Sequence, residues 1–269
     1  MKPANLPVQY QQVSPGQWEI IDAEVIVETP VSLTVNGVLW LTFMCTPVDL
    51  EAMAIGFLFN EGMVKSLDEV ADVRLCASGD NVDVWLHHPL EKPDQWRRTS
   101  GCTGGITSVK VDVDIQQNTN GGVLNSERVG QLINQLFESQ KLYRASGGVH
   151  TSALSDGERI CVVAEDIGRH NTLDKIAGRC LLEGITLSKK IILTTGRISS
   201  EMLQKSSRLN ASIVISRTSP SSLSIELAKK FGITLIGYAR RNRFNIYTHP
   251  ERIVLAPEST EAKKEPIFA

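Results

Sequence analysis

Apolar and polar residues alternate along the first part of the chain, which is typical of β-strands with one buried face. Residues 20–29 and 32–44 follow this pattern and are rich in valine, leucine and threonine. Asn36–Gly37 stands between two valines, and this dipeptide is a signal for a tight turn between antiparallel strands. The pattern therefore predicts a β meander.

A helix and two further strands follow the meander. Thr46 can cap a helix and Pro47 suits its first turn, so we expect a helix that begins there and closes at Gly62. Strands are predicted over 70–77 and 82–88 on either side of a Ser-Gly-Asp-Asn turn. The first part of the chain is therefore mostly β.

The second half changes to a regular alternation of strands and helices. A helix over 126–142 comes first. The segments that follow are predicted strands at 159–165, 190–195, 212–216 and 233–238, alternating with predicted helices at 170–183, 199–209 and 220–231. Such alternation predicts a layered α/β sheet that is largely parallel, because crossover connections between parallel strands are right-handed.

The chain of 269 residues is long enough for two modest cores. We expect a smaller, mostly β domain over 1–123, an α/β domain over 124–256, and a flexible, charge-rich tail over 257–269. The fold class is α/β.

Charge and composition exclude several classes of function. A net charge of -2 argues against general coating of nucleic acid, so an anionic ligand has to be held by local clusters. The N-terminus lacks the apolar core of a signal peptide, and no uncharged apolar stretch is long enough to span a bilayer. We therefore expect a cytoplasmic protein without membrane insertion.

Five cysteines are scattered without the spacing of a disulfide framework or a metal site, so no structural zinc is expected. Four of them lie in apolar segments and are predicted to be buried core thiols: Cys45, Cys76, Cys161 and Cys180.

The fifth cysteine, Cys102, stands in a long predicted loop over 89–123. Arg97 and Arg98 precede it, and three glycines surround it within 101–105. Neighbouring guanidinium groups favour the thiolate, which is the reactive form of cysteine, and glycines allow close approach to the backbone. The alternative is a glycine-rich turn that carries an unreactive surface thiol.

An arginine follows each of the four predicted strands of the α/β half: Arg169, Arg197, Arg217 and Arg240. Ligands of open α/β sheets bind beyond the carboxyl ends of the strands, and helices that begin there offer free N–H groups. The arginines and helix starts could hold phosphates together. The alternative is that each arginine pairs with a nearby acidic side chain. His170, next to Asp166 and Asp174, is either a structural donor or a ligand contact.

Several segments resemble the FdhD/NarQ family of formate dehydrogenase accessory proteins. The matching segments are SGC at 100–102, GGVHTSAL at 147–154, EDIGRHNTLDK at 165–175, GRISSEM at 196–202, SRTSPSSLSIELA at 216–228, and the stretch 237–253 that includes RFNIYTHPERI. Members of this family act as sulfur carriers for the molybdenum cofactor. The resemblance implies an α/β half similar to the cytidine-deaminase fold, and a homodimer.

The resemblance also implies partners and a site. Cys102 would accept persulfide sulfur from a cysteine desulfurase and pass it to bis-molybdopterin guanine dinucleotide, the cofactor destined for formate dehydrogenase. The residues expected to bind this cofactor are Phe244, Asn245, Ile246, Tyr247, Thr248, His249, Arg197, Arg217, Arg169 and Asn171.

The chain departs from the family pattern in its loop. The family has Cys-x-x-Cys there, whereas this chain has Gly105 at the second position, so release of sulfur by an internal disulfide is excluded. Two functions remain: a sulfurtransferase that works with Cys102 alone, or a binding module that only delivers the cofactor. A deaminase is disfavoured, because Ser152 stands where H-x-E would place glutamate after His150, and no Pro-Cys-x-x-Cys occurs.

Overall fold

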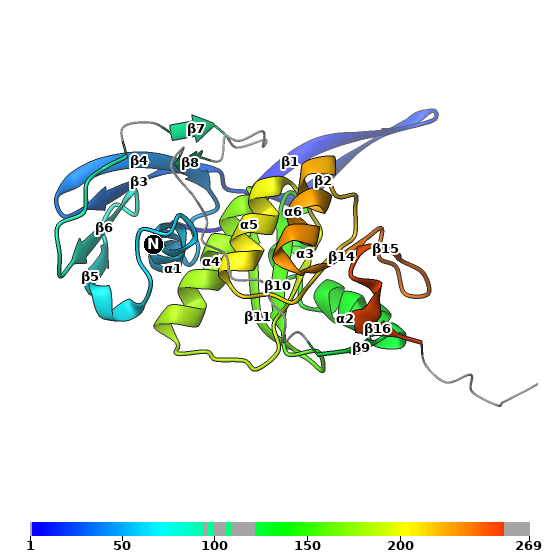
Figure 1. Ribbon diagram of the computed structural model, residues 1–269. Helices are drawn as coiled ribbons and strands as arrows, with labels where there is room; N and C mark the ends of the chain where they lie inside the picture. Colours follow the sequence, from blue (N-terminus) through cyan, green and yellow to red (C-terminus); the bar gives the residue numbers. More distant parts are fainter. Residues whose placement is uncertain (1, 94–95, 99–105, 109–121, 256–269) are drawn as a thin grey trace, which may run out of the picture.

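The structure is a computed structural model, and it describes residues 2–93, 96–98, 106–108 and 122–255. Figure 1 shows a smaller β-rich part from the N-terminal half of the chain beside a larger part in which helices cover a sheet. Among the described residues, no helix is both long and apolar enough to cross a membrane.

The N-terminal part contains a four-stranded sheet with the order β4-β3-β6-β5. Its strands are β3 (Thr29–Val35), β4 (Val38–Cys45), β5 (Val70–Leu75) and β6 (Asn81–Leu86). The predicted turn at Asn36–Gly37 joins β3 to β4, and both of its residues have positive φ angles, 49° and 81°. Asparagine and glycine are the residues that tolerate this conformation, so the turn prediction is confirmed.

Helix α1 (Leu50–Asn60) packs against this sheet and shares its hydrophobic core. It begins later than predicted, since Asp49 precedes its first turn in a left-handed conformation with φ of 51°. The predicted cap at Thr46 was wrong: its hydroxyl accepts a hydrogen bond from the Ile167 amide, 3.2 Å away, in the other half of the chain. Thr46 therefore links the two parts of the molecule.

The second part is built on a six-stranded sheet with the order β11-β10-β12-β13-β14-β15. Its strands are β10 (His150–Ser155), β11 (Ile160–Asp166), β12 (Ile191–Thr194), β13 (Ile213–Ser216), β14 (Thr234–Gly237) and β15 (Asn245–Thr248). Only β12, β13 and β14 pair in parallel, whereas β10 and β15 are antiparallel to their neighbours. The expectation of a largely parallel sheet was wrong, because the sequence pattern did not reveal β10 or β15.

Helices cover both faces of this sheet, so the predicted mixed α/β class is confirmed; likeness to the cytidine-deaminase fold stays a prediction. The helices of one face are α4 (Arg169–Leu182), α5 (Ser200–Arg208) and α6 (Ser222–Phe231), which share a core with the sheet. Helix α2 (Ser126–Glu138) packs on the opposite face. The predicted helix over 126–142 is in fact two, since the short α3 (Leu142–Ser146) follows separately.

Two short 3-10 helices, η1 (Leu67–Glu69) and η2 (Pro250–Arg252), and three two-stranded pairs complete the described elements. The pairs are β1 (Asn5–Ser14) with β2 (Gln17–Ile26), β7 (Trp96–Arg98) with β8 (Ile106–Ser108), and β9 (Leu124–Asn125) with β16 (Ile253–Val254). The β7–β8 pair lies within the segment 89–123 that was predicted to be a loop. The domain boundary near 123 stays a prediction, and the predicted tail over 257–269 lies outside the described residues.

Helices α1 and α4 cross at very short range, and glycines make this possible. A Cβ atom on Gly178 would stand 1.7 Å from the Ala52 carbonyl oxygen, and one on Gly56 would stand 1.8 Å from the Asp174 carbonyl oxygen. Both distances are far below van der Waals contact, and the atoms that would clash belong to the backbone. The crossing therefore requires glycine at these two positions.

Replacing Gly178 by alanine should destabilise the protein, although glycine to alanine within an ordinary helix is stabilising by about 1 kcal/mol. We expect Gly178→Ala to lower the free energy of unfolding by about 3 kcal/mol, the upper end of the range for overpacked cores. Urea unfolding followed by circular dichroism measures this. Glu226→Ala, at an exposed position of α6, is the control and should change stability by less than about 0.5 kcal/mol. Equal stability of both variants would contradict the close crossing.

Candidate anion-binding site

A pocket of about 210 Å³ lies beyond the carboxyl ends of the sheet strands. Arg169 and Arg197 contribute to its wall, as the sequence predicted for strand-end arginines. The remaining lining residues are Ile198, Ser199, Ser219, Pro220 and Ser221. We call this set of seven residues the cationic pocket.

The N-termini of two helices face the cationic pocket. Ser199 caps α5 by accepting a hydrogen bond from the Met202 amide, and Ser221 caps α6 by accepting one from Ser224. The helix N-terminus carries a partial positive charge, which favours an anion. Backbone hydrogen bonds from Ile198 to Ser219 and from Ser221 back to Ile198, of 3.2 and 2.9 Å, hold the two capped loops together. The arrangement suits a phosphate group.

Two histidines lie near the arginines of the pocket. His170 is buried, and its Nε2 atom lies 3.1 Å from the Glu201 carboxylate and 3.3 Å from the Ser199 hydroxyl. The sequence had suggested Asp166 and Asp174 as neighbours of His170. Its partners are instead Glu201 in α5 and Ser199, the N-cap of that helix. Burial lowers the pKa of His170, and burial together with the charge of Arg169 lowers the pKa of His150. Both shifts disfavour protonation of the rings, so the arginines supply the positive charge of the pocket.

Arg217 and Arg240 form a second group, away from the cationic pocket. The Arg217 guanidinium lies over the ring of Phe137 from α2, 4.9 Å from its centre, and donates to the Ala239 carbonyl. Arg240 donates to the carbonyl oxygens of Arg217 and Ala239. Burial and the charge of Arg240 lower the pKa of Arg217. In the part of the chain that the structure describes, neither arginine forms an ion pair, so both charges are available to an anion.

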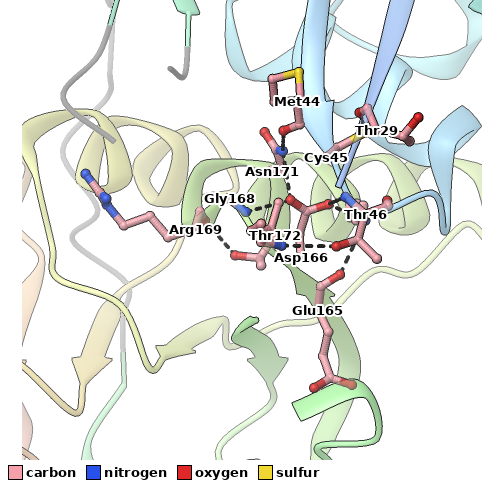
Figure 2. A network of polar contacts seen from close by, with 12 residues as sticks. Thr29, Met44, Cys45, Thr46, Glu165, Asp166, Gly168, Arg169, Asn171 and Thr172 are labelled. Atoms are coloured by element: carbon pink, nitrogen blue, oxygen red, sulfur yellow. Dashed lines mark hydrogen bonds and ion pairs between the residues drawn. The ribbon is translucent and has the colours of Figure 1, made fainter. Parts of the chain in front are cut away.

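Asn171 belongs to a buried polar network beside the pocket. Figure 2 shows its side chain between the Met44 carbonyl and the Asp166 carboxylate, to which its amide donates at 3.0 and 2.8 Å. The Arg169 side chain extends away from this network. Asn171 is 6% exposed and its amide has partners within the protein, so the structure gives it a role in holding α4 to the end of β4. Its predicted contact with a cofactor stays a prediction.

The segment 244–249, predicted to bind a cofactor, contains the edge strand β15. Thr248 is buried, and its hydroxyl donates to the Ile233 carbonyl and accepts from the Leu235 amide. His249 contacts Glu251 through Nδ1 at 3.0 Å. Phe244 and Tyr247 pack partly into the two cores on either side of the sheet. Asn245 and Ile246 are exposed, so they are the members of the segment best placed to meet a ligand.

Cys102 lies outside the described residues, in the connection between β7 and β8. The four other cysteines were predicted to be buried, and this was right only for Cys45, whose pKa burial raises to about 12. Cys161 and Cys180 are partly exposed, and burial raises the pKa of each. Cys76 is partly exposed in a turn, where a hydrogen bond with Ser78 lowers its pKa. Cys76 is therefore the thiol that competes with Cys102 for reactivity.

The serines of the pocket were not among the predicted site residues. Ser199 and Ser221 are the first and second residues of the predicted helices 199–209 and 220–231, whereas the observed helices begin one residue after each serine. Serine at the start of a helix is typical of an N-cap, so the signal was present. Gly196 lets its loop approach Arg169 and His150 closely, because a Cβ atom there would lie 3.1 Å from the Cβ of Arg169 and 3.5 Å from Nδ1 of His150. Among the described residues, no three His, Cys, Asp or Glu side chains form a group that could hold a metal ion.

These features define an α/β protein with a pocket at the carboxyl edge of its sheet, lined by two arginines and the N-termini of two helices. Comparisons with known proteins identify the family. The family model described as FdhD/NarQ matches residues 26–254, so the chain belongs to the FdhD/NarQ family. The described pocket and both arginine groups lie within these limits.

Individual relatives agree with this assignment. The sulfur carrier protein FdhD of Bacillus subtilis is 36% identical over 91% of this chain and 95% of its own length. That of Bacillus pumilus is 37% identical, with the same coverage of both chains. A crystal structure of a formate dehydrogenase accessory protein from Desulfotalea psychrophila is similar with a TM-score of 0.77 and 30% identity, covering 94% of this chain and all of the other.

Proposed function

We propose that the protein is a sulfur carrier that serves the maturation of formate dehydrogenase in the cytoplasm. Cys102 takes sulfur from the persulfide of a cysteine desulfurase and passes it to bis-molybdopterin guanine dinucleotide. Membership of the FdhD/NarQ family and the names of the relatives support the sulfur-carrier role. The observation that carries the cofactor part of the proposal is the cationic pocket, where two arginines and two helix N-termini converge.

Loading of Cys102 is a simple exchange at sulfur. The Cys102 thiolate attacks the terminal sulfur of the desulfurase persulfide, a bond forms between Sγ and that sulfur, and the desulfurase cysteine leaves as a thiolate. The transferred atom keeps its oxidation state. Arg97 and Arg98, close in sequence, favour the thiolate that begins the step.

The delivery of sulfur from Cys102 differs from delivery by a loop that carries two cysteines. An acceptor attacks the terminal sulfur of the Cys102 persulfide, and Cys102 leaves as a thiolate. Reduction of the transferred sulfur to sulfide takes two electrons. A second loop cysteine could supply them by forming a disulfide, but Gly105 stands at that position. The electrons therefore come from an external thiol or from the reduced metal of the substrate.

The anionic parts of the cofactor account for the pocket. A guanine dinucleotide carries a pyrophosphate, and charge-assisted hydrogen bonds from arginine hold such groups well. Arg169 and Arg197 at the pocket, with Arg217 and Arg240 at the second group, provide four cations at one edge of the sheet. The exposed residues Asn245 and Ile246 on β15 are the proposed contacts for the remainder of the cofactor.

GDP binding tests the cofactor part of the proposal. We expect GDP to bind more tightly than ADP, because a site built for the N1–H and amino donors of guanine leaves its acceptors unpaired with adenine. Arg197→Ala should weaken GDP binding about tenfold or more, since it removes a charged hydrogen bond worth roughly 1.5–3 kcal/mol. Isothermal titration calorimetry measures both effects.

Arg74→Ala serves as the control, because Arg74 is exposed on β5, where its ion pair is with Asp72, and it does not line the cationic pocket. This variant should bind GDP as the wild type does. Equal affinity for GDP and ADP would mean that the site reads phosphates alone. Absence of binding by either nucleotide would remove the cofactor part of the proposal.

A second function, delivery of the cofactor without sulfur transfer, is favoured by Gly105 at the position of the second loop cysteine. Both functions need the same pocket, so nucleotide binding does not separate them. Loading of sulfur on Cys102 does, because a protein that only delivers the cofactor has no use for a persulfide.

A further inference from the structure

A carboxylate stands close behind the wall of the cationic pocket, where its charge is unfavourable to an anion. Glu201 lies in the first turn of α5, two residues after Ser199, which lines the pocket. A negative charge at this position repels the anion that the arginines attract. An acidic residue also interacts favourably with a helix N-terminus, and this is the structural explanation for its presence. Its contact with His170 indicates a further role.

Glu201 determines where the His170 ring carries a proton. Nε2 of His170 lies 3.1 Å from the Glu201 carboxylate. An ionised carboxylate can only accept hydrogen bonds, so Nε2 has to be the donor. This holds for the neutral ring and for the protonated ring, because Nε2 carries a proton in both. His170 is buried, so the protein rather than solvent fixes the direction of this hydrogen bond.

The same ring nitrogen constrains the Ser199 hydroxyl. Nε2 lies 3.3 Å from Oγ of Ser199, and because Nε2 carries a proton it cannot accept one from the serine. Oγ also accepts a hydrogen bond from the Met202 amide at 3.4 Å, as the N-cap of α5. Oγ is therefore an acceptor toward both neighbours. Within the described part of the chain its own proton has no acceptor, so this proton is left for a ligand in the pocket.

We propose that Glu201 and His170 are positioning residues that fix the Ser199 hydroxyl as a hydrogen-bond donor to the anion in the cationic pocket. The arginines of the pocket and the free N–H groups at the helix starts can also only donate. The pocket thus presents donors to its ligand, which selects an oxygen that carries no proton, as in a phosphate or a pyrophosphate. This inference rests on the proposed function and names two residues that shape the same site.

The two explanations for Glu201 predict changes of opposite sign in GDP affinity. If the carboxylate acts only through its charge, its removal takes away a repulsion, and GDP should bind more tightly. If it acts through His170, its removal leaves Nε2 free to accept the serine proton, and the pocket loses a donor. Loss of a hydrogen bond to a charged group weakens binding about tenfold.

Isothermal titration calorimetry with GDP and with inorganic phosphate distinguishes these explanations. Glu201→Met should weaken GDP binding about tenfold. Glu201→Gln removes the same charge but keeps an oxygen that can accept the Nε2 proton, so it should recover most of the affinity that Glu201→Met loses. Glu226→Met removes an exposed carboxylate of α6 and, as the control, should bind GDP as the wild type does. Tighter binding by Glu201→Met, or equal weakening by both Glu201 variants, would overturn the proposal.

Ser199→Gly shows whether Glu201 acts through the serine. Glycine is tolerated at an N-cap, so this variant removes the hydroxyl and keeps the start of α5. It should weaken GDP binding about tenfold, and Glu201→Met should cause no further loss in this background. A second loss of the same size in the double variant would mean that Glu201 acts by another route and would contradict the proposal.

The proton on His170 can be observed without any ligand. Long-range proton–nitrogen spectra of protein labelled at histidine separate protonated from bare ring nitrogens, and His170→Gln identifies the signals of this ring. We expect a proton on Nε2 in the wild type and on Nδ1 in Glu201→Met. A bare Nε2 in the wild type would overturn this proposal alone, whatever the affinity for GDP. Failure of the wild type to bind both GDP and phosphate would instead overturn the cofactor part of the proposed function, and this proposal with it.

Discussion

Cys102→Ser should abolish sulfur loading when the protein is incubated with a cysteine desulfurase and free cysteine. The wild type should acquire one persulfide, at Cys102, because two arginines precede this thiol and glycines surround it. Serine is close in size but cannot hold sulfane sulfur. Mass spectrometry of the intact protein and its peptides, with a thiol-blocking step to preserve persulfides, measures the loading at each cysteine.

The control for this experiment is Cys76→Ser. Cys76 is the described thiol whose pKa is lowered, through its hydrogen bond with Ser78, so chance reaction would occur there first. Its removal should leave the loading of Cys102 unchanged. Burial raises the pKa values of Cys45, Cys161 and Cys180 and suppresses their thiolates. Sulfur mainly on Cys76, or none on Cys102 with an active desulfurase, would favour the delivery function.

The elements of the α/β half could be predicted closely where burial produces a clear periodicity. Helix α4 was expected over 170–183 and occupies Arg169–Leu182. Strand β10 was missed because five of its six residues are buried, so the sequence shows no alternation of apolar and polar positions. Strand β1 was missed for the opposite reason, since both of its faces are largely exposed, and the strand predicted over 20–29 overlaps β2 only in part.

The candidate site could be predicted in part. The rule that ligands meet the carboxyl ends of strands located the arginines, and it placed Arg169 and Arg197 correctly at a pocket wall. It could not show that Arg217 turns toward α2 while Arg197 turns toward α5, because the face that a loop takes depends on tertiary packing. The role of Asn171 in the buried network was equally hidden, since its partner Met44 is distant in sequence.

Lys175→Met should cause a large loss of stability, because it leaves a buried carboxylate without its cation. Lys175 and Asp166 are both fully buried, and Nζ lies 2.6 Å from Oδ2. The same carboxylate accepts hydrogen bonds from the Thr46 and Gly168 amides at 3.0 and 2.7 Å. Removing one partner of a buried ion pair costs roughly 3–5 kcal/mol, and we expect a loss of this size in urea unfolding.

Arg179→Met on the same helix is the matched control. Arg179 pairs with Glu183 one turn along α4, at a partly exposed position where an ion pair contributes less than about 1 kcal/mol. A comparable loss in both variants would show that the buried pair has no special role. If Lys175→Met alone is strongly destabilised, the Asp166 network is what fastens the end of β4 to α4. That attachment fixes the helix whose first residue, Arg169, lines the cationic pocket, so GDP binding by the folded fraction of Lys175→Met should weaken as well.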